Sequence, residues 1–141
     1  MSLERALGIG ATGLTAQRTR MEVVSSNLAN SHTTRTPDGG PYRRKQPIFE
    51  AQAIDLFPSD ALGRSVRAVR VVQVVDDPSD FMVRHEPGHP DADERGFVEY
   101  PNVDPIREMV DMLSATRSYE ANVTLVRSVR EMMQSALQIL A

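Results

Sequence analysis

The sequence predicts an α+β protein in which long N- and C-terminal helices pair as an antiparallel coiled coil around a small β-rich insert. Three observations predict this fold: an apolar stripe over the first helix, a β-branched run near residue 70, and a glycine-free and proline-free stretch after Pro105. The 141 residues suit one domain. We therefore expect residues 1–30 and 105–141 to form one discontinuous helical domain, with the β-rich insert at residues 31–104.

The first helix is predicted from Ser2 to Ala29, because apolar residues recur there at alternating steps of four and three. The apolar members of this stripe are Leu3, Leu7, Leu14, Met21, Val24 and Leu28. Gly8, Gly10 and Gly13 each cost up to ~1 kcal/mol relative to alanine in a helix, although small residues also permit close helix approach. We expect this helix to be frayed or disordered in isolation.

The insert is predicted to hold about three to five strands, separated by turn-forming residues. The clearest strand covers residues 66–75, which are rich in valine but do not alternate cleanly between apolar and polar. That pattern indicates either burial on both faces or a β-bulge. Further extended segments are expected at residues 42–49, 81–83 and 97–100, and turns at residues 30–41 and 76–80.

The second helix is predicted to begin after Asp104, which is a good N-cap, with Pro105 in the first helical position. Its stripe comprises Met109, Met112, Tyr119, Asn122, Val123, Val126, Val129, Met133, Leu137 and Leu140. A helix of this length needs another long helix as its partner, and the N-terminal helix is the obvious one. Both stripes are wide enough to need neighbouring molecules as well, although a hairpin packed only on itself remains the alternative.

Composition excludes several classes of protein. The chain has no cysteine, which excludes disulfides, thiolate zinc sites and cysteine catalysis. Its formal net charge of −3 argues against a general nucleic-acid binder, and no apolar run is long enough to span a bilayer. Aromatic residues make up only 5%, so the core is expected to be small or completed by partner chains.

Charge is unevenly distributed along the chain. Residues 76–104 carry nine acidic and two basic side chains, whereas the flanking segments are weakly basic or neutral. Such a chain can dock head to tail on copies or relatives of itself, and a solvated acidic loop is the equally acceptable alternative. The N-terminus lacks the positively charged start of a secretory signal peptide, because Glu4 offsets Arg5.

Two motifs resemble metal sites but are discounted. His85 to His89 match the H-E-x-x-H spacing of zinc proteases, but Pro87 and Gly88 oppose the helix which that chemistry requires. The stretch that starts at Asp91 begins like a calcium-binding loop but lacks the later oxygen ligands. We therefore expect no enzyme activity, no metal site and no cofactor.

A basic cluster gives the remaining candidate site. Tyr42, Arg43, Arg44 and Lys45 could bind an anionic polymer, although an exposed interface or strand edge is the favoured interpretation. These four residues are therefore candidate subunit contacts rather than a nucleic-acid site.

Both ends of the chain carry a resemblance to a known family. Ser26-Asn27-Leu28-Ala29-Asn30, followed by Thr33-Thr34, resembles the N-terminal signature of bacterial flagellar rod, hook and hook-associated proteins. The segments 101–112 and 117–122 resemble the matching C-terminal signature. Residues 39–45, 77–79 and 87–93 further resemble the FlgC family of small proximal rod proteins. Phe81-Met82, Phe97 and Asp104 depart from the usual pattern of the family without touching the terminal signatures.

This resemblance implies a structural subunit of the flagellar basal body that stacks helically into a hollow rod. The rod would cross the periplasm, enclose the export channel and transmit motor torque for motility. The implied partners are other rod proteins, copies of the chain itself, a membrane-ring or export-gate adaptor, and a rod cap during assembly. Export would use the flagellar type III apparatus without a cleaved signal. A generic coiled-coil adaptor or scaffold is the alternative that the helices alone would allow.

Three asparagines are candidate positioning residues within this scheme. Asn27 and Asn30 are expected to cap or orient the turn after the first helix, and Asn122 to set the helix register from within the stripe. Ordinary local caps or solvated polar positions are the alternative for all three. We further hypothesise that the terminal helices become ordered only on assembly, which would suppress premature polymerisation.

Overall fold

The computed structural model describes residues 3–53 and 67–140, and it confirms the predicted α+β fold. The elements are α1 (Leu3–Ala29), β1 (Lys45–Ala53), β2 (Arg67–Asp76), β3 (Met82–His85), β4 (Phe97–Tyr100) and α2 (Pro105–Leu140). Both long helices and all four segments expected to be extended are found close to their predicted bounds. Ser2 and Val66, which were predicted to open the first helix and the main strand, lie outside the described residues.

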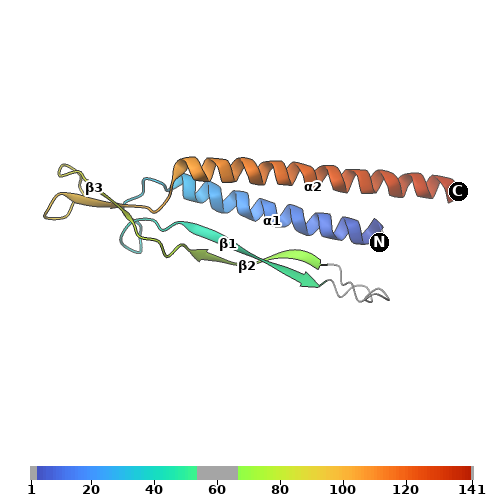
Figure 1. Cartoon of the computed structure of the whole chain (residues 1–141), viewed down its shortest axis with the longest axis horizontal. Coiled ribbons are helices and arrows are strands. Elements are labelled where there is room, and N and C mark those ends of the chain that lie inside the picture. The colour runs from blue at the N-terminus through green and yellow to red at the C-terminus, as the bar shows by residue number, and fades with distance from the viewer. Residues whose placement is uncertain (1–2, 54–66, 141) are drawn as a thin grey trace.

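The two helices run side by side in opposite directions, so that both ends of the chain lie at the same end of the molecule (Figure 1). With 27 and 36 residues, α1 and α2 span about 40 Å and 54 Å at the usual rise per residue. The helices are aligned where α1 ends and α2 begins. The C-terminal end of α2 therefore projects beyond the start of α1.

Asp104 begins α2 as predicted. Its Oδ1 accepts hydrogen bonds from the backbone N–H groups of Ile106, at 3.0 Å, and Arg107, at 3.4 Å. These two donors belong to the first turn of the helix, where no backbone carbonyl is available to them. The N-cap thus fixes the start of α2 close to the last turn of α1.

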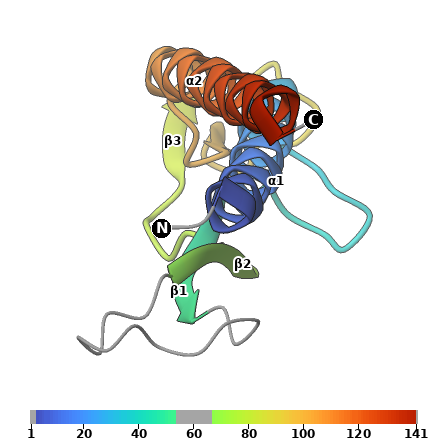
Figure 2. The same cartoon turned by 90° about the vertical axis from the view of Figure 1, so that its right-hand side faces the viewer.

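Strands β1 and β2 form an antiparallel hairpin that lies along α1, on the side away from α2 (Figure 2). The order of the layers is therefore α2, α1 and hairpin. The register shifts between Ile48 and Phe49, which pair with Gln73 and Val71, so Val72 is an additional residue on β2. This β-bulge explains why the valine-rich strand does not alternate cleanly.

Strands β3 and β4 form a second antiparallel hairpin at the end of the molecule remote from the chain termini (Figure 1). Within the described residues the four strands therefore form two separate two-stranded sheets. An isolated two-stranded hairpin is only marginally stable in water. The β1–β2 hairpin is supported by its contacts with α1, whereas the β3–β4 hairpin contacts neither helix among the described elements and depends on the connecting loops.

The apolar core is thin and is built mainly from small side chains. Ala16 and Val24 of α1 and Ala115 and Val129 of α2 are buried. The largest fully buried side chains are Glu108, Val98, Asn27 and Pro101, so two of the four are polar. As the low aromatic content suggested, the apolar core is small, and buried polar contacts supplement it.

Two glycines of α1 allow this close helix packing. A Cβ atom on Gly10 would lie 2.8 Å from Cγ2 of Val126, a separation that side-chain atoms do not tolerate. A Cβ atom on Gly13 would lie 3.0 Å from the side-chain nitrogen of Asn122. Gly8, in contrast, has open space around it. The glycines that weaken the isolated helix thus let α2 approach it.

This difference between glycines predicts opposite effects of one substitution. Gly8→Ala should raise the free energy of unfolding by up to ~1 kcal/mol, because alanine favours the helix without a steric conflict. Gly10→Ala should cancel or reverse that gain, because overpacking costs about 1–3 kcal/mol. Urea unfolding followed by circular dichroism measures both variants. Equal stabilisation by the two alanines would contradict the proposed packing role of Gly10.

Candidate functional site

A buried polar junction joins the last turn of α1, the first turns of α2 and the segment that leads into β1. At its centre the side chain of Asn27 is fully buried and makes four hydrogen bonds. Its Nδ2 donates to the backbone oxygen of Lys45 at 2.8 Å and to Oε2 of Glu108 at 3.0 Å. Its Oδ1 accepts from the Tyr42 hydroxyl at 3.0 Å and from the Lys45 N–H at 2.9 Å. The amide thus uses its full hydrogen-bonding capacity.

Glu108 brings α2 into the same junction with a carboxylate that has no exposed surface. Its Oε1 lies 2.6 Å from Nε of Arg44, whose side chain is itself only 17% exposed. Because Glu108 lies in the first turn of α2, the positive end of the helix dipole also favours its charge. The buried carboxylate is therefore paired, hydrogen-bonded and placed where the helix stabilises it.

Ion pairs extend the junction to neighbouring segments. The guanidinium of Arg44 also contacts Asp77, at 3.3 Å, and Asp111, at 3.8 Å. Asp111 in turn pairs with Arg20 of α1 at 3.0 Å. Burial alone would lower the pKa of Arg44, but the hydrogen bonds and charges of Glu108 and Asp77 outweigh it and raise that pKa above its usual value. Arg44 is therefore a permanent cation within the junction.

A second amide connects this junction to the turn before β3. Oδ1 of Asn102 accepts from the Arg44 N–H at 2.8 Å, and its Nδ2 donates to Oγ of Ser79 at 2.8 Å. Hydrogen bonds from Ser79, and further ones from Arg44 and Gln46, hold the pKa of Asp77 below its ordinary value despite partial burial. The turn after β2 is thus fixed to the base of the helices.

The basic cluster does not have the exposure that its sequence suggested. Tyr42 is buried, and Arg44 is largely enclosed by the acidic groups that pair with it. Arg43 donates to the backbone oxygens of Asp77 and Ser79 and lies 4.2 Å from the ring centroid of Phe81. Arg43 and Arg44 therefore connect parts of one subunit: Arg44 pairs with carboxylates, whereas Arg43 binds backbone oxygens and the ring of Phe81. Lys45 is exposed, and its role as a subunit contact stays a prediction.

Asn30 closes the C-terminal end of α1. Its backbone N–H and its Nδ2 both donate to the carbonyl oxygen of Ser26, at 3.1 Å and 2.9 Å. Oδ1 of Asn30 accepts from the Thr33 hydroxyl at 3.2 Å. This is a local cap, whereas Asn27 in the same sequence motif joins three segments.

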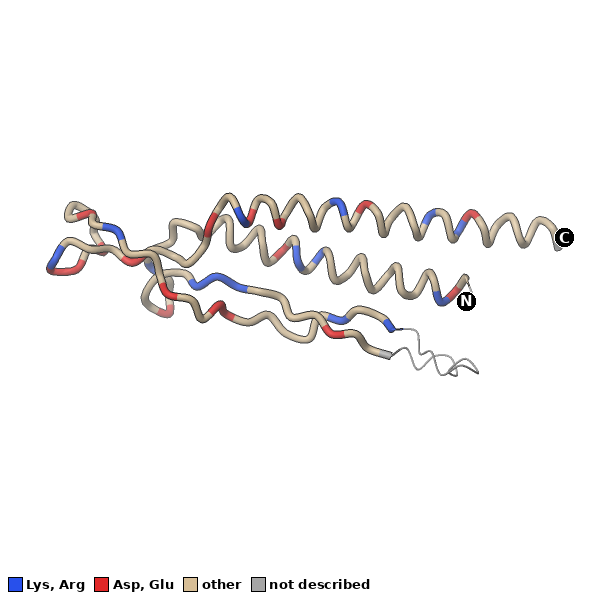
Figure 3. Tube along the Cα trace, viewed as in Figure 1, with Lys and Arg blue, Asp and Glu red and all other residues tan. Residues whose placement is uncertain are grey.

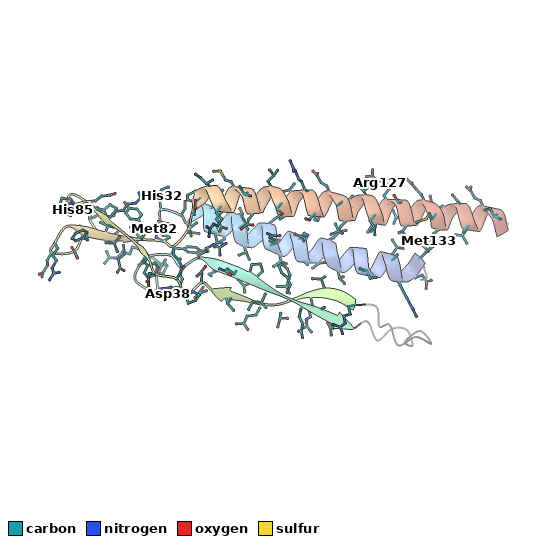
Figure 4. All side chains as sticks on the ribbon, viewed as in Figure 1. His32, Asp38, Met82, His85, Arg127 and Met133 are labelled. Carbon is teal, nitrogen blue, oxygen red and sulfur yellow. The ribbon has the colours of Figure 1, made fainter. Side chains whose placement is uncertain are left out.

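Most of the predicted stripe residues are buried or half-buried in the structure. All six apolar members on α1 are buried or half-buried, namely Leu3, Leu7, Leu14, Met21, Val24 and Leu28. On α2 the same holds for Met112, Tyr119, Asn122, Val123, Val126, Val129 and Met133. Met109 and Leu137 are exceptions, being 57% and 66% exposed, and the side chain of Leu140 is outside the described part. In Figure 4, Met133 lies on the α1 side of α2 and Arg127 lies away from it.

An apolar patch on the outside of α2 was missed by the sequence reasoning, apart from Met109. It consists of Ile106, Met109, Val110 and Leu113, which are 75%, 57%, 62% and 53% exposed. Their spacing of three, one and three residues places them on one face of the helix, opposite the side that carries buried Glu108 and Ala115. This spacing is visible in the sequence, but Met109 was assigned to the stripe that faces α1 and the other three residues were not considered.

The discounted metal motifs have no site geometry in the described residues. His85 ends strand β3 (Figure 4) and its ring is tilted against that of Phe97, with 5.0 Å between the ring centroids. His89 belongs to the loop between β3 and β4. No group of three or more candidate metal ligands occurs in residues 3–53 and 67–140. Neither of the two described helices combines the length and hydrophobicity needed to cross a membrane.

The comparisons with known proteins agree with this helical architecture. Residues 7–35 match the family model described as "Flagella basal body rod protein", and residues 94–139 match the one described as "Flagellar basal body rod FlgEFG protein C-terminal". These matches define the class as flagellar basal-body rod proteins. Both matched segments include the residues of the polar junction on α1 and α2.

Full-length relatives narrow this class. Flagellar basal-body rod proteins FlgC of Borreliella burgdorferi and Bacillus subtilis are 45% and 43% identical to the chain, with 99% of each sequence covered. The FlgC protein of Salmonella typhimurium is 40% identical over 99% of this chain and 98% of its own. The chain belongs to the FlgC family of flagellar basal-body rod proteins. It is a structural subunit of the rod rather than an enzyme.

The junction predicts that the two asparagines of the Ser26–Asn30 motif differ in importance. Asn27→Asp should lower the free energy of unfolding by about 3–5 kcal/mol, because it buries a second carboxylate beside Glu108. Asn30→Asp is the matched control, and it should cost about 1 kcal/mol, since it removes one exposed hydrogen bond. Urea unfolding at neutral pH gives both values. Similar losses for the two variants would show that Asn27 is no more than a local cap.

Proposed function

We propose that the chain assembles with neighbouring rod subunits through the apolar patch of Ile106, Met109, Val110 and Leu113. The observation that carries this proposal is that four large apolar side chains, each more than half exposed, lie together on one helix face. A monomer gains nothing from such a patch, whereas a subunit of a rod can bury it against a neighbour. Membership of a rod-protein family supports this use.

The assembly we propose is an open helical one. The patch on α2 and the two hairpins are different surfaces, so contacts between them are heterologous and do not close after two subunits. Repetition of such a contact produces a tube, which would enclose the export channel and transmit motor torque across the periplasm. The polar junction supports this role, because it ties both helices to the hairpins by ion pairs and hydrogen bonds.

We propose as partners other rod proteins and further copies of the chain, in keeping with the family. A membrane-ring or export-gate adaptor and a rod cap complete the set expected from the family resemblance. Export through the flagellar type III apparatus without a cleaved signal remains part of the proposal.

We also propose that much of the helix pair becomes ordered only in the rod. The core between the helices is narrow, and polar contacts are concentrated near the junction. Toward the chain termini, α2 loses its partner and exposes Leu137 and Ile139. Ordering those ends costs conformational entropy that contacts with neighbouring subunits can offset.

A charge in the apolar patch should block assembly without unfolding the subunit. We expect Leu113→Glu and Ile106→Glu to abolish rod incorporation and swimming in a bacterium that lacks its own copy of this protein. The reason is that an unpaired carboxylate would be buried against the neighbour. Incorporation is measured by immunoblotting of isolated basal bodies, and swimming by expansion in soft agar.

Thr15→Glu is the matched control, because it adds the same charge to an exposed position of α1 near the Arg18–Glu22 ion pair. This variant should enter rods as the unchanged chain does. Circular dichroism establishes whether each variant keeps its helices. Normal swimming of both patch variants would contradict the proposed contact.

Amide hydrogen exchange of the purified monomer tests the proposed ordering. We expect slow exchange around the junction, at residues 24–29 and 105–112, because buried hydrogen bonds hold these turns. Fast exchange is expected at residues 3–17 and 118–139. Strong protection along both helices in a proven monomer would show that the α1–α2 pair is stable without neighbouring subunits, and this would contradict the ordering hypothesis.

A further inference from the structure

The C-terminal end of α2 is an uncharged helical overhang. After Glu131 the sequence has no charged side chain, and this end of the helix continues past the start of α1 (Figures 1 and 3). Leu137 and Ile139 are 66% and 85% exposed there. A helix that ends in exposed apolar residues with no charge is poorly suited to water. This overhang, residues 134–139 in the described part, therefore offers an apolar surface to a partner.

An uncharged groove runs along one flank of the helix pair, close to the same end. Two adjoining cavities of about 400 and 530 Å³ share Ala6 and Leu125 as lining residues. They extend from Gln17, beside the β1–β2 hairpin, to Leu3 and Met132. None of the residues that line either cavity is charged, in keeping with an uncharged run in α1 from Ala6 to Gln17. The groove can accept an apolar helix but offers no site to a charged ligand.

One polar atom at the inner end of this groove lacks a partner. Oε1 of Gln17 is buried and finds no hydrogen-bond donor among the residues that the structure describes. Such an acceptor is costly unless a donor reaches it. The overhang offers donors of the right kind, since Gln134 and Gln138 are neutral amides four residues apart on the helix. An occupant that is apolar and carries side-chain amides therefore suits the groove.

We infer that the groove receives the overhang of a second copy of this chain. The inference rests on the proposed function, because it assigns one of the contacts that build the rod. Groove and overhang are different surfaces of one subunit, so the contact is heterologous and can repeat without closing. The absence of charge on both surfaces supports this pairing, since neither would have to bury an unpaired ion. The apolar patch at residues 106–113 remains available for another neighbour.

Cysteine cross-linking tests this contact directly, because the chain has no cysteine of its own. Leu137→Cys marks the overhang, and Ser128→Cys marks the groove with little change in size. Arg127→Cys is the matched control, one residue from Ser128 but on a different flank and exposed. Bacteria that lack their own copy would make two differently tagged variants, and the isolated basal bodies would be oxidised. A disulfide forms only when the Cα atoms come within about 7 Å.

We expect Leu137→Cys combined with Ser128→Cys to yield at least about fivefold more mixed disulfide than Leu137→Cys combined with Arg127→Cys. Equal yields from the two pairs would overturn the inference. So would a 137–137 disulfide as the main product when the Leu137→Cys variant is made alone, since that product indicates a closed two-fold contact. The unchanged chain must restore swimming in the same strain. If it restores swimming but the specific disulfide is absent, the inference fails and the rod function stands; if the chain does not enter basal bodies, the proposed function fails.

Discussion

A carboxylate buried away from water destabilises a protein unless its oxygens are paired, and the arrangement of this subunit depends on how Glu108 meets that requirement. One oxygen is bound by Arg44 and the other by Asn27, so the start of α2, the approach to β1 and the last turn of α1 are held at one point. The apolar core is too thin to set this geometry alone, because it consists mainly of alanine and valine. Hydrogen bonds are directional, so the junction fixes the relative position of three segments in a way that apolar contacts do not.

The elements that could be predicted from the sequence are those with local causes. Periodic apolar residues, an N-cap followed by proline and β-branched runs all act within a few residues, and the structure confirms the helices and strands derived from them. The polar junction depends on residues that are more than 60 positions apart in the chain, such as Arg44 and Glu108. Nothing local distinguishes Arg44 from an exposed arginine, so its cluster was interpreted as a surface. The bulge at Val72 was one of two readings of the valine pattern, and only strand pairing decided between them.

The side of α2 that faces α1 and its exposed side differ in the contacts that they can make. The inward side is narrow, contacts α1 through small residues and relies on Gly10 and Gly13 for close approach. The outward side begins with the apolar patch at residues 106–113 and ends with the uncharged overhang, and charged residues are placed between them. In the proposed assembly, these two separate apolar regions would contact two different neighbours at a fixed spacing along the helix, as a helical assembly requires.

The position of Glu108 also constrains the order in which the chain can fold. Its hydrogen bond to Asn27 closes a loop of 81 residues, and the Arg20–Asp111 pair closes one of 91. Contacts of such long sequence separation form late, because the entropy of closing the loop is lost before any contact forms. Asn27 therefore lacks its hydrogen bond to Glu108 until about three quarters of the chain is free to fold. The order of the elements along the chain thus makes the polar junction depend on both of its ends, so a fragment that stops before Glu108 cannot complete it.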